Sequence, residues 1–113
     1  MPVPATDLAR LFPLESLRQE TRDQLAREAS VSDYSRGENV FEAGDLDDDT
    51  VYLLDGELRC NYPDGRSVAH LASAPHGRYS LNDAVPRRFT AKVVSGKARV
   101  MRIDRRYLEK LIT

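Results

Sequence analysis

The stretch ENVFEAGDLDDDTVYLLDGELRCNY, residues 38–62, decides the fold that we expect. Apolar runs at 39–41 and 51–54 flank an acidic turn that opens with Gly44 and Asp45, and a second turn at Asp55-Gly56 leads into 57–62. Valine, phenylalanine, tyrosine and leucine suit a half-buried pleated surface, whereas glycine and aspartate permit tight reversals. The stretch therefore predicts three successive strands joined by short turns.

The same period of two continues on both sides of this stretch, with glycine, proline or aspartate between the apolar runs. Short strands with frequent tight turns are typical of a β-sandwich, roll or barrel rather than of an α/β sheet. The expected strands cover residues 31–35, 38–42, 50–54, 57–62, 66–71, 89–94 and 98–103.

The residues before the strands, 1–29, follow helical spacing instead. Thr6 or Asp7 is expected to cap a short helix that places Leu8, Leu11 and Phe12 on one side before Pro13 interrupts it. A second amphipathic helix is expected over residues 17–29. These elements form a helical lead-in that packs on the strands.

The chain ends in another short helix, over residues 104–113, with Asp104 as its expected N-cap. Its apolar stripe can pack on the same domain or form a homodimer, and the short length of the stripe favours the first. The stripe consists of Tyr107, Leu108, Leu111 and Ile112.

Length and composition indicate a single domain over residues 1–113. The formal net charge of −1 argues against a general nucleic-acid surface. Cys60 is the single cysteine, so no internal disulfide can form, and we expect it to be a small buried hydrophobic side chain. No long apolar run or leader pattern is present, so a cytoplasmic protein is expected. No nucleophile, nucleotide-loop or cofactor motif occurs, which argues against an enzyme and against a bound cofactor.

The order of these elements resembles the cyclic-nucleotide-binding domain, the β-roll module of catabolite-activator-type regulators, kinase regulatory subunits and gated channels. The resemblance runs from Leu8 to Thr113 and implies a β-roll of jelly-roll type, with seven or eight antiparallel strands over residues 30–103. It rests on the ordered turns Arg36-Gly37, Gly44-Asp45, Gly56, Asp64-Gly65 and Gly77.

The family binds its ligand with a cassette of Phe-Gly-Glu, a short helix, and an arginine followed by small residues. The resemblance implies that the glutamate accepts a hydrogen bond from the ribose while the arginine and helix-start amides hold the cyclic phosphate. In residues 77–91 Tyr79 replaces the aromatic residue, Ser80 the glycine and Leu81 the glutamate. The candidate ligand-binding residues are Tyr79, Ser80, Asn82, Asp83, Arg87, Arg88 and Thr90.

The missing carboxylate predicts a regulatory or interaction module that does not bind cyclic AMP or cyclic GMP in the family's manner. An alternative is a sensor of another nucleotide or phosphate-bearing small molecule that uses Arg87 and Arg88. The alternative without a ligand is that one of the arginines Arg78, Arg87 and Arg88 pairs with Asp83 while the other two face water. A DNA-reading segment often follows the last helix in this family, and none follows in this sequence, so direct DNA binding is not expected.

Two metal hypotheses carry less weight. Asp45, Asp47 and Asp49 alternate as in a calcium-binding loop, but Thr50 and Gly56 occupy the positions of its glycine and glutamate. A cupin-like metal enzyme would need more ligands than two histidines, His70 and His76. A solvated acidic turn and structural histidines are therefore expected, with no metal bound.

Overall fold

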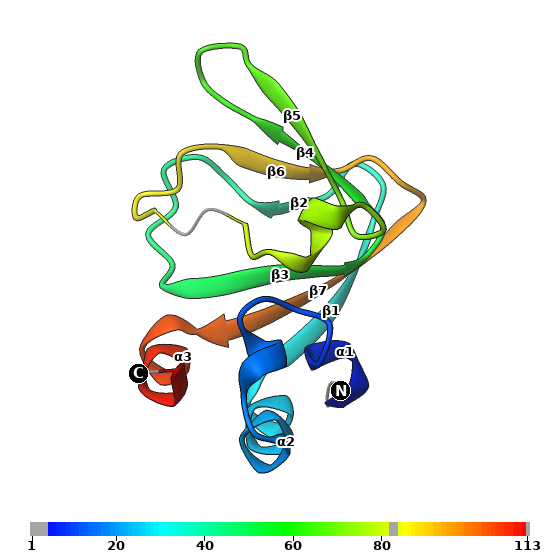
Figure 1. Ribbon diagram of the computed structural model, residues 1–113. Helices are drawn as coiled ribbons and strands as arrows, with labels where there is room; N and C mark the ends of the chain where they lie inside the picture. The colour runs from blue at the N-terminus through cyan, green and yellow to red at the C-terminus, as the bar shows by residue number, and fades with distance from the viewer. Residues whose placement is uncertain (1–4, 82–83, 113) are drawn as a thin grey trace.

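The computed structural model describes residues 5–81 and 84–112, in which seven antiparallel strands form two sheets that close a roll (Figure 1). One sheet has the order β1-β7-β3 and the other β2-β6-β4-β5. The expected β-roll is confirmed, and every strand end lies within one residue of the prediction. The strands are β1 (Ser30–Ser35), β2 (Asn39–Phe41), β3 (Asp49–Asp55), β4 (Glu57–Asn61), β5 (Ser67–Leu71), β6 (Thr90–Val93) and β7 (Lys97–Asp104).

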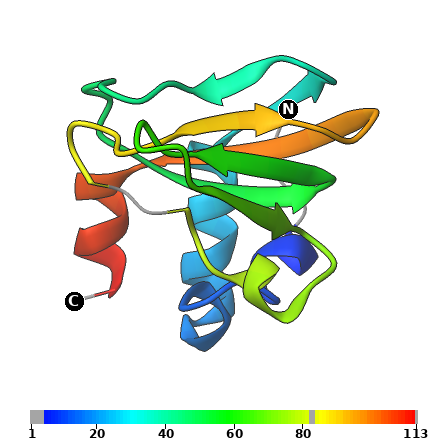
Figure 2. The ribbon, with the colours of Figure 1, turned by 90° about the horizontal axis from the view of Figure 1, so that it is seen from above.

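The three α-helices all pack on the outer face of the three-stranded sheet (Figure 1), and α2 and α3 run roughly side by side along it (Figure 2). A cluster of buried side chains fills this layer and includes Leu25, Tyr52, Met101 and Leu108. The helices are α1 (Ala5–Leu8), α2 (Gln19–Glu28) and α3 (Arg105–Ile112), and two short 3-10 turns are η1 (Leu14–Ser16) and η2 (Pro75–Arg78).

The lead-in departs from the prediction in three respects. The first helix is described over Ala5–Leu8, so Thr6 and Asp7 lie within this range rather than before it. Phe12 is exposed, unlike Leu8 and Leu11, because the helix ends at Leu8 and Phe12 therefore no longer follows the helical face. The second helix begins at residue 19 rather than 17, because the two residues before it have extended backbones and residues 14–16 form η1.

The last helix begins as expected, since the amide of Tyr107 donates to Oδ1 of Asp104 at 3.1 Å. Leu108 is buried in the helical layer, and Tyr107 and Leu111 pack against the same cluster. Packing of the stripe on its own domain is therefore confirmed. Ile112 alone of the four is exposed, and a homodimer through this helix stays a prediction.

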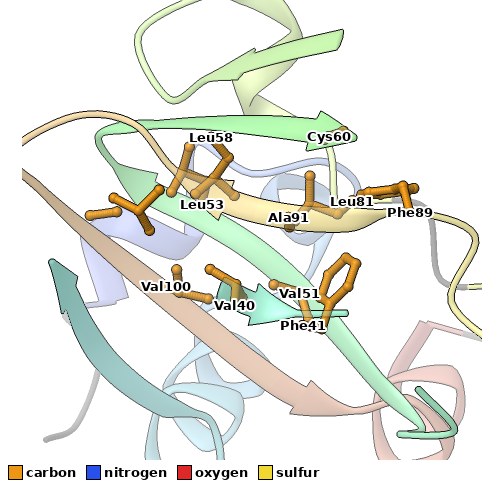
Figure 3. Close-up of a cluster of buried hydrophobic side chains, with 12 residues drawn as sticks. Val40, Phe41, Val51, Leu53, Leu58, Cys60, Leu81, Phe89, Ala91 and Val100 are labelled. Carbon is orange, nitrogen blue, oxygen red and sulfur yellow. The ribbon is translucent and has the colours of Figure 1, made fainter. Parts of the chain in front are cut away.

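Strand β3 is buried on both faces because it separates two cores. Val51 and Leu53 belong to the cluster inside the roll (Figure 3), whereas Tyr52 and Leu54 belong to the helical layer. Cys60 is also inside the roll, where burial raises the pKa of its thiol to about 11 and makes the reactive thiolate scarce at neutral pH. No helix in the described part of the chain is long and apolar enough to cross a membrane.

Candidate functional site

The candidate cassette, residues 77–91, begins within η2 and ends within β6, and its residues 82 and 83 lie outside the described residues. It begins at Gly77, which is buried against the backbone of Leu71 and Ala72 at the end of β5. A Cβ atom at this position would lie 2.3 Å from the carbonyl oxygen of Leu71 and 2.5 Å from that of Ala72. Glycine is therefore required at this position for close backbone approach, whether or not a ligand binds.

Tyr79 contacts the lead-in. Its ring lies 5.1 Å from the ring of Phe12, centroid to centroid, and its side chain remains 46% exposed. Arg78 lies over both rings and forms an ion pair with Glu15, while its carbonyl oxygen accepts a hydrogen bond of 2.8 Å from the amide of Phe12. The start of the cassette is thus held against the segment between α1 and η1.

The next two residues occupy the positions of the family's glycine and glutamate. Ser80 is half-buried, and Leu81 is only 3% exposed because its side chain belongs to the core of the roll beside Phe89 and Cys60 (Figure 3). The amide of Leu81 donates to the carbonyl oxygen of Val51 at 2.9 Å, which fixes its backbone to β3. The candidates Asn82 and Asp83, and hence any pairing with Asp83, lie outside the described residues.

Arg87 is buried, with 2% exposure, and its guanidinium binds the connection between β2 and β3. Its Nε donates to Oδ2 of Asp47 at 3.0 Å and its Nη2 to Oδ1 of the same carboxylate, which makes the pair bidentate. Nη2 also donates to the carbonyl oxygen of Asp49 at 2.7 Å, and the Cζ atom lies 4.2 Å from the ring centroid of Phe41. These contacts stabilise the roll.

Arg88 and Thr90 differ from Arg87 in what they contact. Arg88 is exposed and forms none of the ion pairs in the described part of the chain. The hydroxyl of Thr90 accepts a hydrogen bond of 3.1 Å from the amide of Ala43. The two adjacent arginines therefore do not form one cationic surface, and Arg87 and Thr90 both hold the segment before β3.

No family model and no curated protein matches the sequence. Solved structures do match: cAMP-bound PfPKA-R has a TM-score of 0.79 at 18% identity, with 96% of this chain and 38% of that chain covered. The regulatory subunit of a cAMP-independent protein kinase A from Trypanosoma brucei has a TM-score of 0.77 at 16% identity, with 95% and 40% covered. The sensor domain of the transcriptional regulator DNR from Pseudomonas aeruginosa has a TM-score of 0.79 at 15% identity, with 96% and 80% covered.

The chain has the cyclic-nucleotide-binding fold. At these identities the likeness concerns the fold, and the chain spans about two fifths of the two kinase-subunit structures.

Sequence reasoning considered Asp47 only as part of a calcium-binding pattern and missed its pairing with Arg87 in this cyclic-nucleotide-binding fold. The hydrogen bond from Arg87 is the largest cause that lowers the pKa of its carboxyl group. The alternating aspartates had favoured a solvated turn, and their carboxylates are in fact occupied within the protein. Asp45 accepts from the amide of Glu42 at 2.9 Å, and Asp49 forms an ion pair with Arg102 at 3.6 Å. A calcium site therefore has no support from these three residues.

The two histidines of the cupin hypothesis do lie together, on β5 and η2, with ring centroids 5.3 Å apart. Nε2 of His76 accepts a hydrogen bond of 3.1 Å from the amide of Leu71. Within residues 5–81 and 84–112, no group of three or more histidine, cysteine, aspartate or glutamate side chains could hold a metal ion. The hydrogen bond from Leu71 gives His76 a structural role at the end of β5.

His70 should make the stability of the fold depend on pH. Burial, and then the charge of His76, lower its pKa from 6.5 to about 4. Its contribution to the free energy of unfolding is therefore complete above pH 6.5 and is lost as the pH falls toward 4. Between pH 7 and pH 4.5 the free energy of unfolding of the wild type should fall by on the order of 1 kcal/mol relative to that of His70→Leu. This value allows for the partial exposure of the His70 ring to solvent. Urea denaturation of both proteins across this range measures the difference, and parallel curves would contradict it.

Proposed function

We propose that the chain is a regulatory or interaction module that does not bind cyclic AMP or cyclic GMP in the usual manner of its fold. The observation that carries the proposal is the burial of Leu81 in the core of the roll, where the family's cassette presents a carboxylate. An apolar side chain cannot accept the hydrogen bond of a ribose hydroxyl, which would be left unpaired. Loss of a charge-assisted bond of this kind weakens binding by roughly 1.5–3 kcal/mol, or about one to two orders of magnitude.

Arg87 supports the same proposal. Both nitrogens that form its fork with Asp47 already donate to a carboxylate, and its side chain is out of contact with water. A cyclic phosphate would have to compete with that carboxylate or share the guanidinium with it. If the phosphate displaced Asp47, the carboxylate of Asp47 would lose its partner. The free-energy cost of that loss would offset much of the free energy gained by binding the phosphate.

The similar structures support a regulatory role rather than an enzymatic one. DNR is described as a transcriptional regulator whose matching part is a sensor domain, and the Trypanosoma brucei protein as the regulatory subunit of a cAMP-independent kinase. Modules of this kind act by biasing alternative arrangements of flanking helices. In this chain those helices are the lead-in and α3, both of which contact the three-stranded sheet.

Isothermal titration should detect no binding of cyclic AMP or cyclic GMP to the purified chain at concentrations up to about 100 μM, since the lost contacts remove one to two orders of magnitude of affinity. Thermal melting gives a second readout, because a ligand that binds the native state raises its melting temperature. Low-micromolar binding of either nucleotide would overturn the proposal.

A second candidate is a sensor of another phosphate-bearing molecule, and the exposure of Arg88 without an ion pair in the described part of the chain favours it. A panel of mononucleotides and inorganic phosphate, tested with Arg88→Ala, separates the candidates. A rise in melting temperature that disappears in the variant supports this sensor. An unchanged melting temperature with every anion excludes it at the concentrations tested.

A further inference from the structure

His76 closes the edge of β5 at its last residue, Leu71. β5 is an edge strand, and the amide of Tyr62 donates to the carbonyl oxygen of Arg66 at 2.8 Å in the turn that precedes it. In an antiparallel pair, alternate residues from Arg66 onward therefore bond to β4, and the amide of Leu71 points away from it. That amide donates to Nε2 of His76 at 3.1 Å, so a side chain satisfies a donor on the open edge.

The same hydrogen bond joins the end of β5 to η2, in which the cassette begins. The intervening turn is tight, since the amide of Ala74 donates to the carbonyl oxygen of Leu71 at 3.2 Å and the amide of Gly77 to that of Ala74 at 2.8 Å. Gly77 packs directly on the carbonyl oxygens of Leu71 and Ala72. The position of η2 on β5 therefore depends on close backbone approach together with the bond to His76.

Only the neutral form of His76 can make this bond. A neutral imidazole carries its proton on one nitrogen and a lone pair on the other, so Nε2 accepts a hydrogen bond when the proton is on Nδ1. Protonation places an N–H group on Nε2, which then faces the amide donor of Leu71 and cannot accept from it. Histidine is the side chain whose charge ordinarily changes between pH 5 and 8. A bond made by the neutral form is present at high pH and is lost as the pH falls.

The nearest titratable neighbour of His76 does not compensate its charge. The ring of His70 lies 5.3 Å away, centroid to centroid, and its Nε2 atom is buried. Burial, and then the charge of His76, lower the pKa of His70 to about 4, so His70 stays largely neutral at pH 5.5. His76 itself is exposed and forms none of the ion pairs in the described part of the chain.

The other titratable side chains nearby lie on β3, which contacts η2, on η2 itself, and opposite Leu71 on β4. Three of them have partners elsewhere, and the other two are the acidic residues at the turn between β3 and β4. They are Asp49 with Arg102, Tyr52 with the carbonyl oxygen of Phe12, Arg78 with Glu15, and the acidic pair Asp55 and Glu57.

We propose that His76 is a pH-sensitive latch between β5 and η2: the neutral ring holds the amide of Leu71, and protonation releases η2 from the edge of the strand. The ligand of this device is the proton, and the segment that it frees, residues 72–78, leads into the cassette. The latch goes beyond the proposed function, because it operates whether or not a nucleotide binds.

Hydrogen exchange of the full chain, followed by NMR at pH 7.5 and pH 5.5 and expressed as protection factors, tests the latch. The protection factor of the Leu71 amide should fall roughly three- to ten-fold in the wild type, while those of β6 and β7 stay unchanged. In His76→Gln, which keeps a side-chain acceptor but does not titrate, it should be the same at both pH values. In His76→Ala it should be low at both. His70→Leu is the matched control, because His76 still titrates and the fall should persist.

The latch is overturned if the Leu71 amide of the wild type is equally protected at both pH values, or if its fall persists in His76→Gln. Loss of the effect in His70→Leu would assign the titration to His70 and would also overturn it, as would an equal loss of protection in β6 and β7. Should the amide exchange too fast to follow, its chemical shift gives the same test, since it should follow the titration of His76 in the wild type and stay constant in His76→Gln. Binding of cyclic AMP would overturn the proposed function and leave these results standing.

Discussion

Replacing Asp47 with alanine should lower the free energy of unfolding by about 3 kcal/mol, since removal of one partner from a buried ion pair leaves the other charge uncompensated. The guanidinium of Arg87 has no contact with solvent, whereas the side chain of Asp47 is 27% exposed, which places the expected loss at the lower end of the range for buried pairs. The carbonyl oxygen of Asp49 and the ring of Phe41 remain as weaker partners.

Urea denaturation at pH 7 measures this loss. Asp33→Ala is the matched control, because its pair with Arg99 is exposed on both sides and should contribute less than about 1 kcal/mol. The double variant Asp47→Ala with Arg87→Met should recover part of the loss, since it also removes the stranded charge. A loss below about 1 kcal/mol for Asp47→Ala would contradict the structural role of this pair.

Acid adds a signature to the same experiment. The pKa of Asp47 is lowered in the folded protein, chiefly by the hydrogen bond from Arg87, so the stability it contributes is present above the ordinary value of 3.8 and is lost as the pH falls through the folded value. The difference between the wild type and Asp47→Ala should therefore be constant from pH 7 to about pH 4 and shrink below that. A difference that shrank already between pH 7 and pH 5 would point to another group.

Replacing Leu81 with glutamate should destabilise the fold by more than about 3 kcal/mol at pH 7 and should not create binding of cyclic AMP. Although this substitution restores the residue type of the family's cassette, the side chain lies in the core of the roll, where it would place a carboxylate among apolar side chains. Burial would raise the pKa of the new carboxyl group. The penalty should therefore be smaller near pH 4, where only the cost of burying a neutral carboxyl group remains, and should grow as the pH rises above about 4.3.

Denaturation at pH 4.5 and pH 7, with titration of cyclic AMP at both, tests this expectation. Leu81→Met is the matched control, because it keeps the volume and polarity of the site and should change stability by less than about 1.5 kcal/mol. A stable Leu81→Glu protein with micromolar affinity for cyclic AMP would mean that residue 81 can turn out of the core. That outcome would contradict the burial of Leu81 as the reason for the proposed lack of cyclic-nucleotide binding.

The strands could be predicted from sequence because their signals are local. The alternation of Val51, Tyr52, Leu53 and Leu54 between two faces, and the glycine in each turn, depend on neighbours within a few residues. Gly44 and Gly56, for example, have φ values of 94° and 101°, as tight reversals require. The lead-in was less well predicted, because the extended backbone at residues 17 and 18 has no comparable signal.

The candidate site was less predictable because its contacts are distant in sequence. Arg87 and its partner Asp47 are 40 residues apart, and nothing in the local sequence distinguishes the buried Arg87 from the exposed Arg88. The alternating aspartates had the same composition as a solvated loop. Only the closure of the roll brings a carboxylate to Arg87. The direction in which each arginine points, rather than its residue type, therefore determines whether it is available to a ligand.

The position of β3 between two cores has a consequence for how this protein can vary. Its residues 51 and 53 pack inside the roll, and its residues 52 and 54 pack against the helical layer. A change in side-chain volume at any of these four positions therefore alters the packing of one layer, while the adjacent residue in the strand still packs in the other layer. The roll and the helical layer cannot be exchanged or removed as separate modules, and we expect them to unfold and to diverge as a single unit.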